Sequence, residues 1–128
     1  MTGDPPLAIT RINPPELGTP PGYSQVVEVN AGRLIFIAGQ TATNQDGALV
    51  GKNDFSAQAA QVFRNLNVAL RSVGATAGNL VKLTVFLRNM DNLSAYRGER
   101  NRFFETVAPP AAPAVTLVEV SRLYGWTS

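Results

Sequence analysis

The spacing of apolar residues along this chain alternates between the period of a helix and the period of a strand. The order of these two patterns constrains the fold more than any other feature of the sequence. From residue 53 to residue 74, apolar side chains recur every three or four positions, which predicts an amphipathic helix. Asn53 or Asp54 can serve as its N-cap, and Gly74 suits the position just beyond its last residue. This stretch is the most clearly helical part of the chain.

A strand, a second helix and another strand are predicted after it. Residues 80–88 alternate between apolar and semi-polar side chains, which is typical of a strand with one face against a core. A helix follows from about 93 to 104 and is ended by prolines. The β-branched run within residues 108–123 then predicts a strand that contains one acid, Glu119.

The beginning of the chain is rich in proline. Residues 1–22 hold six of the nine prolines, which predicts an extended arm with a short strand near residues 7–12. Residues 23–30 and 33–40 are two β-rich runs separated by Ala-Gly, and we expect them to form a hairpin. We therefore expect an arm followed by one domain, residues 23–128.

This order of elements predicts an α+β fold, a two-layer sandwich in which two helices cover one face of a mixed sheet. No element of the chain remains to cover the other face. We expect that face to carry Phe86, Val115 and Leu117 beside Thr84 and Glu119, and to pack against further copies of the protein.

The sequence stops early for such a sheet. Residues 121–128 end just after a Tyr-Gly turn, where one more strand would complete the layer. We therefore expect the natural chain to continue with that strand.

The composition excludes several kinds of chemistry. There is no His and no Cys, which removes the usual zinc ligands, the thiolate nucleophile and every Ser-His or Cys-His pair. We expect neither a metal nor an organic cofactor. With no signal region after Met1 and no apolar run of about 18 residues, we expect a soluble cytoplasmic protein without membrane contact. The net charge of +2 and the scattered basic residues argue against nucleic acid as a partner.

Five blocks of the sequence occur in an order that resembles one family. They are PPGYSQVVEV, LIFIAGQ, the alanine-rich helix ending in VG, NLVKLTVFLRNM and PAVTLVEVSRL. Together they resemble the Rid family, also called YjgF/YER057c/UK114 or L-PSP. The resemblance implies a chorismate-mutase-like fold that assembles as a homotrimeric barrel, with ligand clefts between subunits. Its best-known members hydrolyse enamine/imine metabolites such as 2-aminoacrylate, whereas members that lack the catalytic arginine have no settled activity.

The resemblance also implies which positions line the cleft. The arginine that binds the substrate carboxylate is replaced by Val115, a small polar residue by Leu117, and a serine by Ala38. The asparagine on the second helix aligns with Arg97, which could return a guanidinium to the cleft. The acid thought to hold the attacking water would lie beyond residue 128. These changes make the cleft more apolar and indicate a member of the arginine-lacking type.

Other candidate residues each have two interpretations. Glu119 could position water or ligand, or could pair across an interface with Lys82 or Arg88 of a neighbour. Tyr23 matches a tyrosine at the cleft mouth, or is a plain strand-end aromatic. The amides of Gly39 and Gln40 could bind an anion, or Gly39 could merely permit a tight bend. Phe86 could be a ligand platform or part of the trimer core, and Arg97, Arg100 and Arg102 could simply form a solvated helix face. The predicted ligand-binding set is Tyr23, Ala38, Gly39, Gln40, Phe86, Arg97, Val115, Thr116 and Leu117.

Three functions are compatible with these residues. The first is a deaminase-like hydrolase of enamine/imine metabolites that is weak or inactive on standard 2-imino acids, because a valine offers a carboxylate neither charge nor hydrogen bonds. The second is a trimer that binds a small apolar metabolite without catalysis. The third is a ribonuclease or translation inhibitor of the L-PSP type, which the lack of histidine and of a dense basic stripe disfavours.

Overall fold

The computed structural model describes residues 8–123. Its elements follow the order β1 (Ile9–Ile12), β2 (Val26–Val29), α1 (Phe55–Ser72), β3 (Lys82–Leu87), α2 (Leu93–Phe104) and β4 (Ala114–Glu119). Three short 3₁₀ turns lie between them: η1 (Pro15–Leu17), η2 (Ala77–Asn79) and η3 (Met90–Asn92). Both predicted helices and the strands on either side of α2 are confirmed, as is the short strand near residues 7–12. Within residues 8–123, no helix combines the length and apolarity needed to cross a bilayer.

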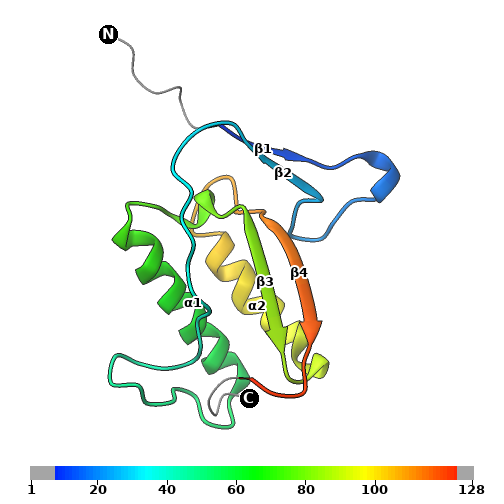
Figure 1. Ribbon diagram of the computed structural model, residues 1–128. Coiled ribbons are helices and arrows are strands. Elements are labelled where there is room, and N and C mark those ends of the chain that lie inside the picture. Colours follow the sequence, from blue (N-terminus) through cyan, green and yellow to red (C-terminus); the bar gives the residue numbers. More distant parts are fainter. Residues whose placement is uncertain (1–7, 124–128) are drawn as a thin grey trace.

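β3 and β4 form a parallel pair with α2 as the connection between them. Figure 1 shows α2 behind this pair and α1 beside α2, so both helices cover one face, as predicted. β1 and β2 form a separate antiparallel pair, which lies beyond the N-terminal ends of β3 and β4 (Figure 1). The α+β class and the layering are therefore those expected from the order of hydrophobic periods.

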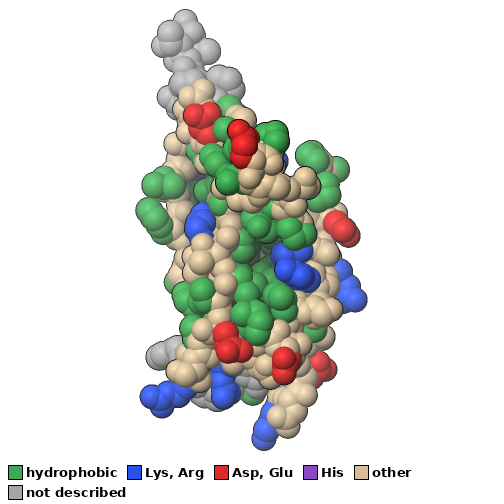
Figure 2. Space-filling model, turned by 90° about the vertical axis from the view of Figure 1, so that its right-hand side faces the viewer, with side chains coloured by type: hydrophobic (Ala, Val, Ile, Leu, Met, Phe, Trp, Pro, Cys, Tyr) green, Lys and Arg blue, Asp and Glu red, His purple; other side chains and the backbone are tan. Residues whose placement is uncertain are grey.

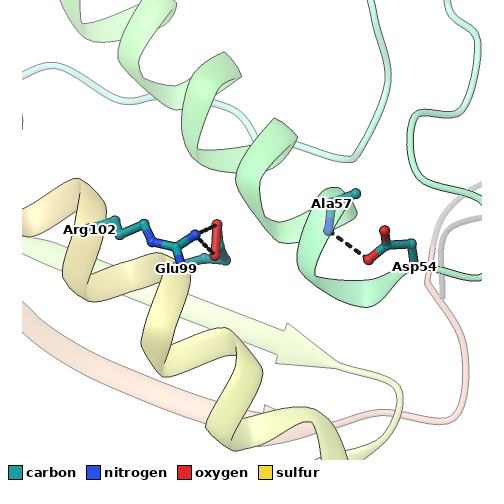
Figure 3. Close-up of polar contacts among 4 residues, drawn as sticks. All are labelled: Asp54, Ala57, Glu99 and Arg102. Atoms are coloured by element: carbon teal, nitrogen blue, oxygen red, sulfur yellow. Dashed lines mark hydrogen bonds and ion pairs between the residues drawn. The ribbon is translucent and has the colours of Figure 1, made fainter.

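α1 begins and ends where its sequence places the caps. The Asp54 carboxylate accepts a hydrogen bond from the Ala57 N–H at 3.1 Å (Figure 3), which satisfies one of the free donors of the first turn. Gly74 lies just beyond the helix with a φ of +76°, a left-handed conformation that costs glycine little. Of the two predicted N-caps, Asp54 is therefore the one used.

An aromatic cluster joins the two helices to the sheet. The Phe63 ring of α1 lies with its centroid 5.8 Å from that of Tyr96 and 5.3 Å from that of Phe103, both on α2. Leu87 of β3 and Phe104 of α2 are buried in the same core. These contacts bring residues from α1, α2 and β3 together. The two helices therefore hold the β3–β4 pair in place through close packing.

The predicted hairpin of residues 23–30 with 33–40 is wrong. β2 pairs with β1 instead, with Ile9 opposite Val29, and residues 33–40 form an extended segment that belongs to no strand. At the turn, the Arg33 guanidinium donates to the carbonyl of Val73, the C-cap residue of α1, at 3.0 Å. This contact leads the chain along α1 and does not return it to β2.

The predicted composition of the open sheet face is also wrong in part. Val115, Leu117 and Glu119 lie opposite Leu83, Val85 and Leu87, and paired residues point to the same side of a sheet. Leu83, Val85, Leu87 and Leu117 pack in the core under the helices, so this whole row faces them. The open face carries the other row, namely Lys82, Thr84, Phe86, Thr116 and Val118. The parallel register between β3 and β4, which the sequence does not reveal, determines which residues lie on the open face.

Candidate ligand site

The predicted ligand-binding residues fall into two groups in the structure. Tyr23, Val115, Leu117 and Arg97 lie around β4 and α2, whereas Ala38, Gly39, Gln40 and Phe86 line a cavity on the other side of β3. Thr116 is on β4 but on the open face of the pair. A single chain therefore does not bring all the predicted ligand-binding residues into one pocket.

Tyr23 is held close to the start of β4 by its neighbour Ser24. The Ser24 N–H donates to the Pro113 carbonyl at 3.0 Å, and the Ser24 hydroxyl donates to the Ala112 carbonyl. Ser24 is only 2% exposed, so these bonds are shielded from water. They fix Tyr23, which is half-buried, beside the segment that leads to Val115. Nothing in the local sequence marks Ser24, because its partners are distant backbone carbonyls.

Val115 and Leu117 form an apolar patch on the helix-facing row. Both are half-buried, and they lie opposite Leu83 and Val85 of β3. Figure 2, a view from the β4 side, shows hydrophobic side chains gathered in a hollow with charged ones around them. Neither residue can donate a hydrogen bond from its side chain, so this patch favours an apolar group over a carboxylate.

Glu119 is engaged within its own chain. Its Oε1 accepts a hydrogen bond from the Met90 N–H at 2.8 Å, at the start of η3 and just ahead of α2. Lys82, one of the two expected partners, instead donates to the hydroxyls of Thr84 at 3.2 Å and Thr116 at 3.1 Å on the open face. In residues 8–123 the Glu119 carboxylate therefore joins the end of β4 to the start of α2.

The three arginines of α2 have different environments. Arg97 is exposed, and Arg102 forms an ion pair with Glu99 at 2.6 Å (Figure 3). Arg100 is only 7% exposed, so its interpretation as part of a solvated face is wrong. The signal was present in the sequence: Arg100 lies four residues after Tyr96 and four before Phe104, on the apolar side of the helix.

Arg100 is a buried cation with no carboxylate bound to it in the described part of the chain. Its Nε and Nη2 donate to the Asn101 Oδ1 at 3.1 and 3.0 Å, and its guanidinium carbon lies 5.9 Å from the Phe104 ring centroid. The turn before Tyr23 packs onto it so closely that a Cβ on Gly22 would lie 2.6 Å from Nη2. Arg100 thus supports the loop that carries Tyr23.

Burial also shifts the acid-base properties of this region. Desolvation raises the pKa of Tyr96 to about 12, although the nearby positive charge of Arg100 opposes the shift. Desolvation lowers the pKa of Arg100, Tyr96 opposes that shift, and Arg97 adds to it. Each of these two side chains therefore favours the charged form of the other, while burial disfavours both charged forms. Among residues 8–123, the buried Tyr96 hydroxyl has no hydrogen-bond partner.

The second group of residues lines a cavity of about 1250 Å³, which we call the slot. Segment 33–40 forms one wall, β3 forms the other, and α1 forms the floor with Phe63, Leu66 and Leu70. Gln40 donates from its side chain to the Ala38 carbonyl at 3.0 Å. Gly39 has no positive φ, and a Cβ there would meet nothing within 4 Å, so no tight bend requires the glycine.

Comparison with known proteins identifies the family. The family model described as Endoribonuclease L-PSP matches residues 16–127. The chain belongs to the L-PSP family, also called the Rid family. A RutC family protein of Haemophilus influenzae is 36% identical over 101 residues, which cover 79% of this chain and 75% of that protein.

Two further relatives bear on fold and chemistry. The crystal structure of the Rid family protein YyfB from Yersinia pestis, described as of unknown function, superposes with a TM-score of 0.81 at 34% identity, covering 93% of this chain and 90% of that one. The 2-iminobutanoate/2-iminopropanoate deaminase of Salmonella typhimurium is 30% identical over 95 residues, covering 74% of this chain and 73% of that enzyme. The Rid fold expected from the sequence is therefore confirmed.

Proposed function

We propose that this Rid-family chain is a deaminase-like hydrolase of reactive enamine/imine metabolites with little activity on standard 2-imino acids. The proposal rests on the environment of Val115, the position at which the resemblance to Rid deaminases implies the arginine that binds the substrate carboxylate. Val115 lies half-buried opposite Leu83, on the same row as Leu117. A carboxylate placed there would lose water and gain no ionic partner.

The residues near Val115 have different roles in this proposed function. Tyr23, fixed through Ser24, covers one side of the cleft, and Val115 and Leu117 hold the apolar part of the ligand. Arg97 is the exposed cation that can reach the cleft from α2. The cleft is completed by a neighbouring subunit of a homotrimer in the cytoplasm. No metal or organic cofactor takes part, since the substrate's own C=N bond is the electrophile that water attacks.

A comparison of the wild type with Val115→Arg tests the proposal. Imino acids are generated in the cuvette by an amino-acid oxidase, and hydrolysis is measured as the loss of trapping by semicarbazide. We expect the wild type to lie close to the uncatalysed rate and Val115→Arg to gain at least about tenfold in kcat/KM. Val115→Met, which adds length without charge, is the matched control and should gain nothing.

A wild-type rate equal to that of the Salmonella deaminase would refute this reading of Val115. One observation favours a second function, binding without catalysis: the Glu119 carboxylate is already engaged by the Met90 N–H. If neither the wild type nor Val115→Arg hydrolyses any imine, yet small apolar metabolites raise the melting temperature of both, the binding function replaces the hydrolase.

A further inference from the structure

Arg100 is a buried charge to which the proposed function assigns no role. Among residues 8–123 it is the only buried charged side chain, with 7% of its surface accessible. Removing a guanidinium from water costs free energy, and an anion bound to it offsets that cost. Within the same residues the ion pair between side chains is that of Arg102 with Glu99, so Arg100 has no such anion there.

The contacts of the Arg100 guanidinium occupy one of its edges. Nε and Nη2 form the side edge, and both donate to the Asn101 Oδ1, at 3.1 and 3.0 Å. Gly22 and the Phe104 ring lie against the group as well. The end edge, formed by Nη1 and the second N–H of Nη2, donates to nothing in the described part of the chain. Two parallel N–H groups match the two oxygens of a carboxylate.

This free edge is not sealed inside the core. In residues 8–123, the fully buried side-chain polar atoms without a hydrogen-bond partner are the Arg11 Nε and the Tyr96 hydroxyl oxygen. The Arg100 Nη1 is not among them, although it also donates to no group of these residues. A small molecule can therefore reach Nη1 from the surface.

Arg100 lies beside the start of β4. A Cβ on Gly22 would be only 2.6 Å from the Arg100 Nη2, so the backbone at Gly22 lies on the guanidinium. Two residues later the Ser24 N–H donates to the Pro113 carbonyl at 3.0 Å. Pro113 is fully buried and precedes Val115 by two residues. The guanidinium and the apolar patch that begins at Val115 are thus held at the same end of β4.

The environment of Arg100 does not depend on how the sheet is completed beside residues 33–40. Neither Arg100 nor Gly22 lines the slot, which lies on the other side of β3 from β4. The groups that contact the guanidinium belong to α2 and to the turn before β2. A strand added in the slot would therefore leave the free edge of Arg100 as it is.

A second cation lies near Arg100. Arg97 is exposed and lies one turn earlier on α2, and its positive charge contributes to the lowered pKa of Arg100. Two like charges repel each other, and an anion close to both relieves that repulsion. Arg102 differs, because Glu99 already binds it at 2.6 Å. Figure 2 shows basic side chains beside the hydrophobic hollow on the β4 side.

We propose that the free edge of Arg100, assisted by Arg97, binds the carboxylate of a ligand whose apolar part lies on Val115 and Leu117. This inference rests on the proposed function and names its substrate class. The substrates are imines in which an apolar spacer separates the acid group from the C=N bond. In 2-imino acids the carboxylate is attached to the C=N carbon itself, at the Val115 end. A phosphate monoester is a poorer fit, because its second negative charge would have only the exposed Arg97 as a partner.

The test measures binding without catalysis, on the full 128-residue chain. The probes are benzoate, phenylacetate, 3-phenylpropanoate and 4-phenylbutanoate, each beside its primary amide, and calorimetry gives the affinities. We expect one acid to bind per chain and its amide to bind at least about tenfold more weakly, because the amide lacks the charge. One spacer length should bind best, since the cation and the apolar patch are fixed relative to each other. Phenyl phosphate should bind more weakly than that acid.

Variants show whether Arg100 is the anchor. Arg100→Met should weaken the best acid at least about tenfold and leave the amide unchanged, while Arg100→Lys, which keeps the charge but loses the paired donors, should fall in between. Arg97→Met should cost about two- to threefold, because an exposed charge contributes less. Arg102→Gln is the matched control on the same helix and should change neither affinity. The melting temperature of Arg100→Met, at or above that of the wild type, separates lost binding from lost folding.

Three results would overturn the proposal. Equal affinities for the acid and its amide would mean that the ligand is held by apolar contact alone. Equal acid affinities for the wild type and Arg100→Met would place the anion elsewhere. A wild type that binds no acid, together with a large fall in melting temperature for Arg100→Met, would mean that a carboxylate of a neighbouring copy already occupies the free edge.

The hydrolase and this anion site fail separately. If no imine is hydrolysed by the wild type or Val115→Arg, yet acid binding depends on Arg100, the hydrolase is refuted and the anion site stands. If Val115→Arg gains hydrolysis of 2-imino acids, yet acid binding is the same with and without Arg100, the anion site is refuted and the reading of Val115 stands.

Discussion

Glu119, at the end of β4, accepts a hydrogen bond from the backbone N–H of Met90, which lies 29 residues earlier at the turn into α2, with 2.8 Å between the two atoms. This bond places a negative charge beside the first free donors of η3 and α2, where such a charge is stabilising. It also ties the C-terminal ends of β3 and β4 together, since Met90 follows β3 closely.

Replacing this carboxylate tests that role. Glu119→Gln keeps an acceptor oxygen but removes the charge, and we expect it to lower the free energy of unfolding by about 0.5–1 kcal/mol. Glu119→Ala should cost about 1–2 kcal/mol, because the Met90 N–H loses its partner. Urea denaturation measures both. An equal cost for the two variants would mean that the hydrogen bond is irrelevant and only the charge matters.

Gly22 and Gly18 provide a second, matched prediction. Both have a positive φ, +78° and +77°, but a Cβ on Gly22 would meet the Arg100 Nη2 at 2.6 Å, whereas a Cβ on Gly18 would meet nothing within 4 Å. Both alanine variants should pay the backbone strain of about 1 kcal/mol, and Gly22→Ala should lose a further 1–2 kcal/mol. Thermal unfolding measures the difference. Equal melting temperatures would show that the Arg100 side chain moves aside freely.

The buried cation itself yields a third prediction. Arg100 is only 7% exposed, with no bound carboxylate in residues 8–123, so its burial costs free energy that an apolar side chain would not. Arg100→Met should leave the unfolding free energy unchanged or raise it by up to about 2 kcal/mol. Arg97→Met, on the exposed side of the same helix, should change it by less than about 0.5 kcal/mol. A large loss for Arg100→Met would mean that packing and the contact with Phe104 outweigh desolvation.

Tyr96 predicts how stability changes at alkaline pH. Burial raises its pKa from 10.0 to about 12, so its contribution to stability is fully present below pH 10 and is lost as the pH rises through 12. Tyr96→Phe should remove this alkaline loss, which is of the order of 1–3 kcal/mol. Because the Tyr96 hydroxyl has no hydrogen-bond partner in the described part of the chain, the same variant should be neutral or slightly stabilising at pH 7. Denaturation series at pH 8, 10 and 11.5 give the comparison, and equal pH profiles for both proteins would contradict it.

Sequence alone predicted the elements whose signals are local. α1, with Asp54 as its cap and Gly74 beyond its end, is determined by residues within one turn of each terminus. The two errors concern long-range pairing. The strand partner of β2 depends on the direction the chain takes after Gly32, and the face occupied by Val115 depends on the parallel register with Leu83. Hydrophobic alternation gives two faces to a strand but does not say which one meets the helices.

In the candidate site too, some features could be predicted from local sequence and others depend on long-range contacts. The resemblance picked out Val115, Leu117 and Ala38, but only the three-dimensional arrangement separates Ala38 from the other two. The burial of Arg100 could have been read from its spacing to Tyr96 and Phe104, because a residue at that spacing shares their side of the helix. Ser24 could not, since its two carbonyl partners lie almost ninety residues away.

The anchoring of segment 33–40 has a consequence for the order of folding. One end is held by the bond from Arg33 to Val73, and the other by the Asn65 amide, which donates to the Thr41 carbonyl at 3.0 Å. Val73 and Asn65 have their positions only once α1 has formed. Contacts within α1 are local and therefore close early, whereas these anchors span 24 and 40 residues and carry a larger loop-closure entropy. Segment 33–40 is therefore expected to take its place only after α1 has formed, because that one helix and its C-terminal cap hold both ends of the segment.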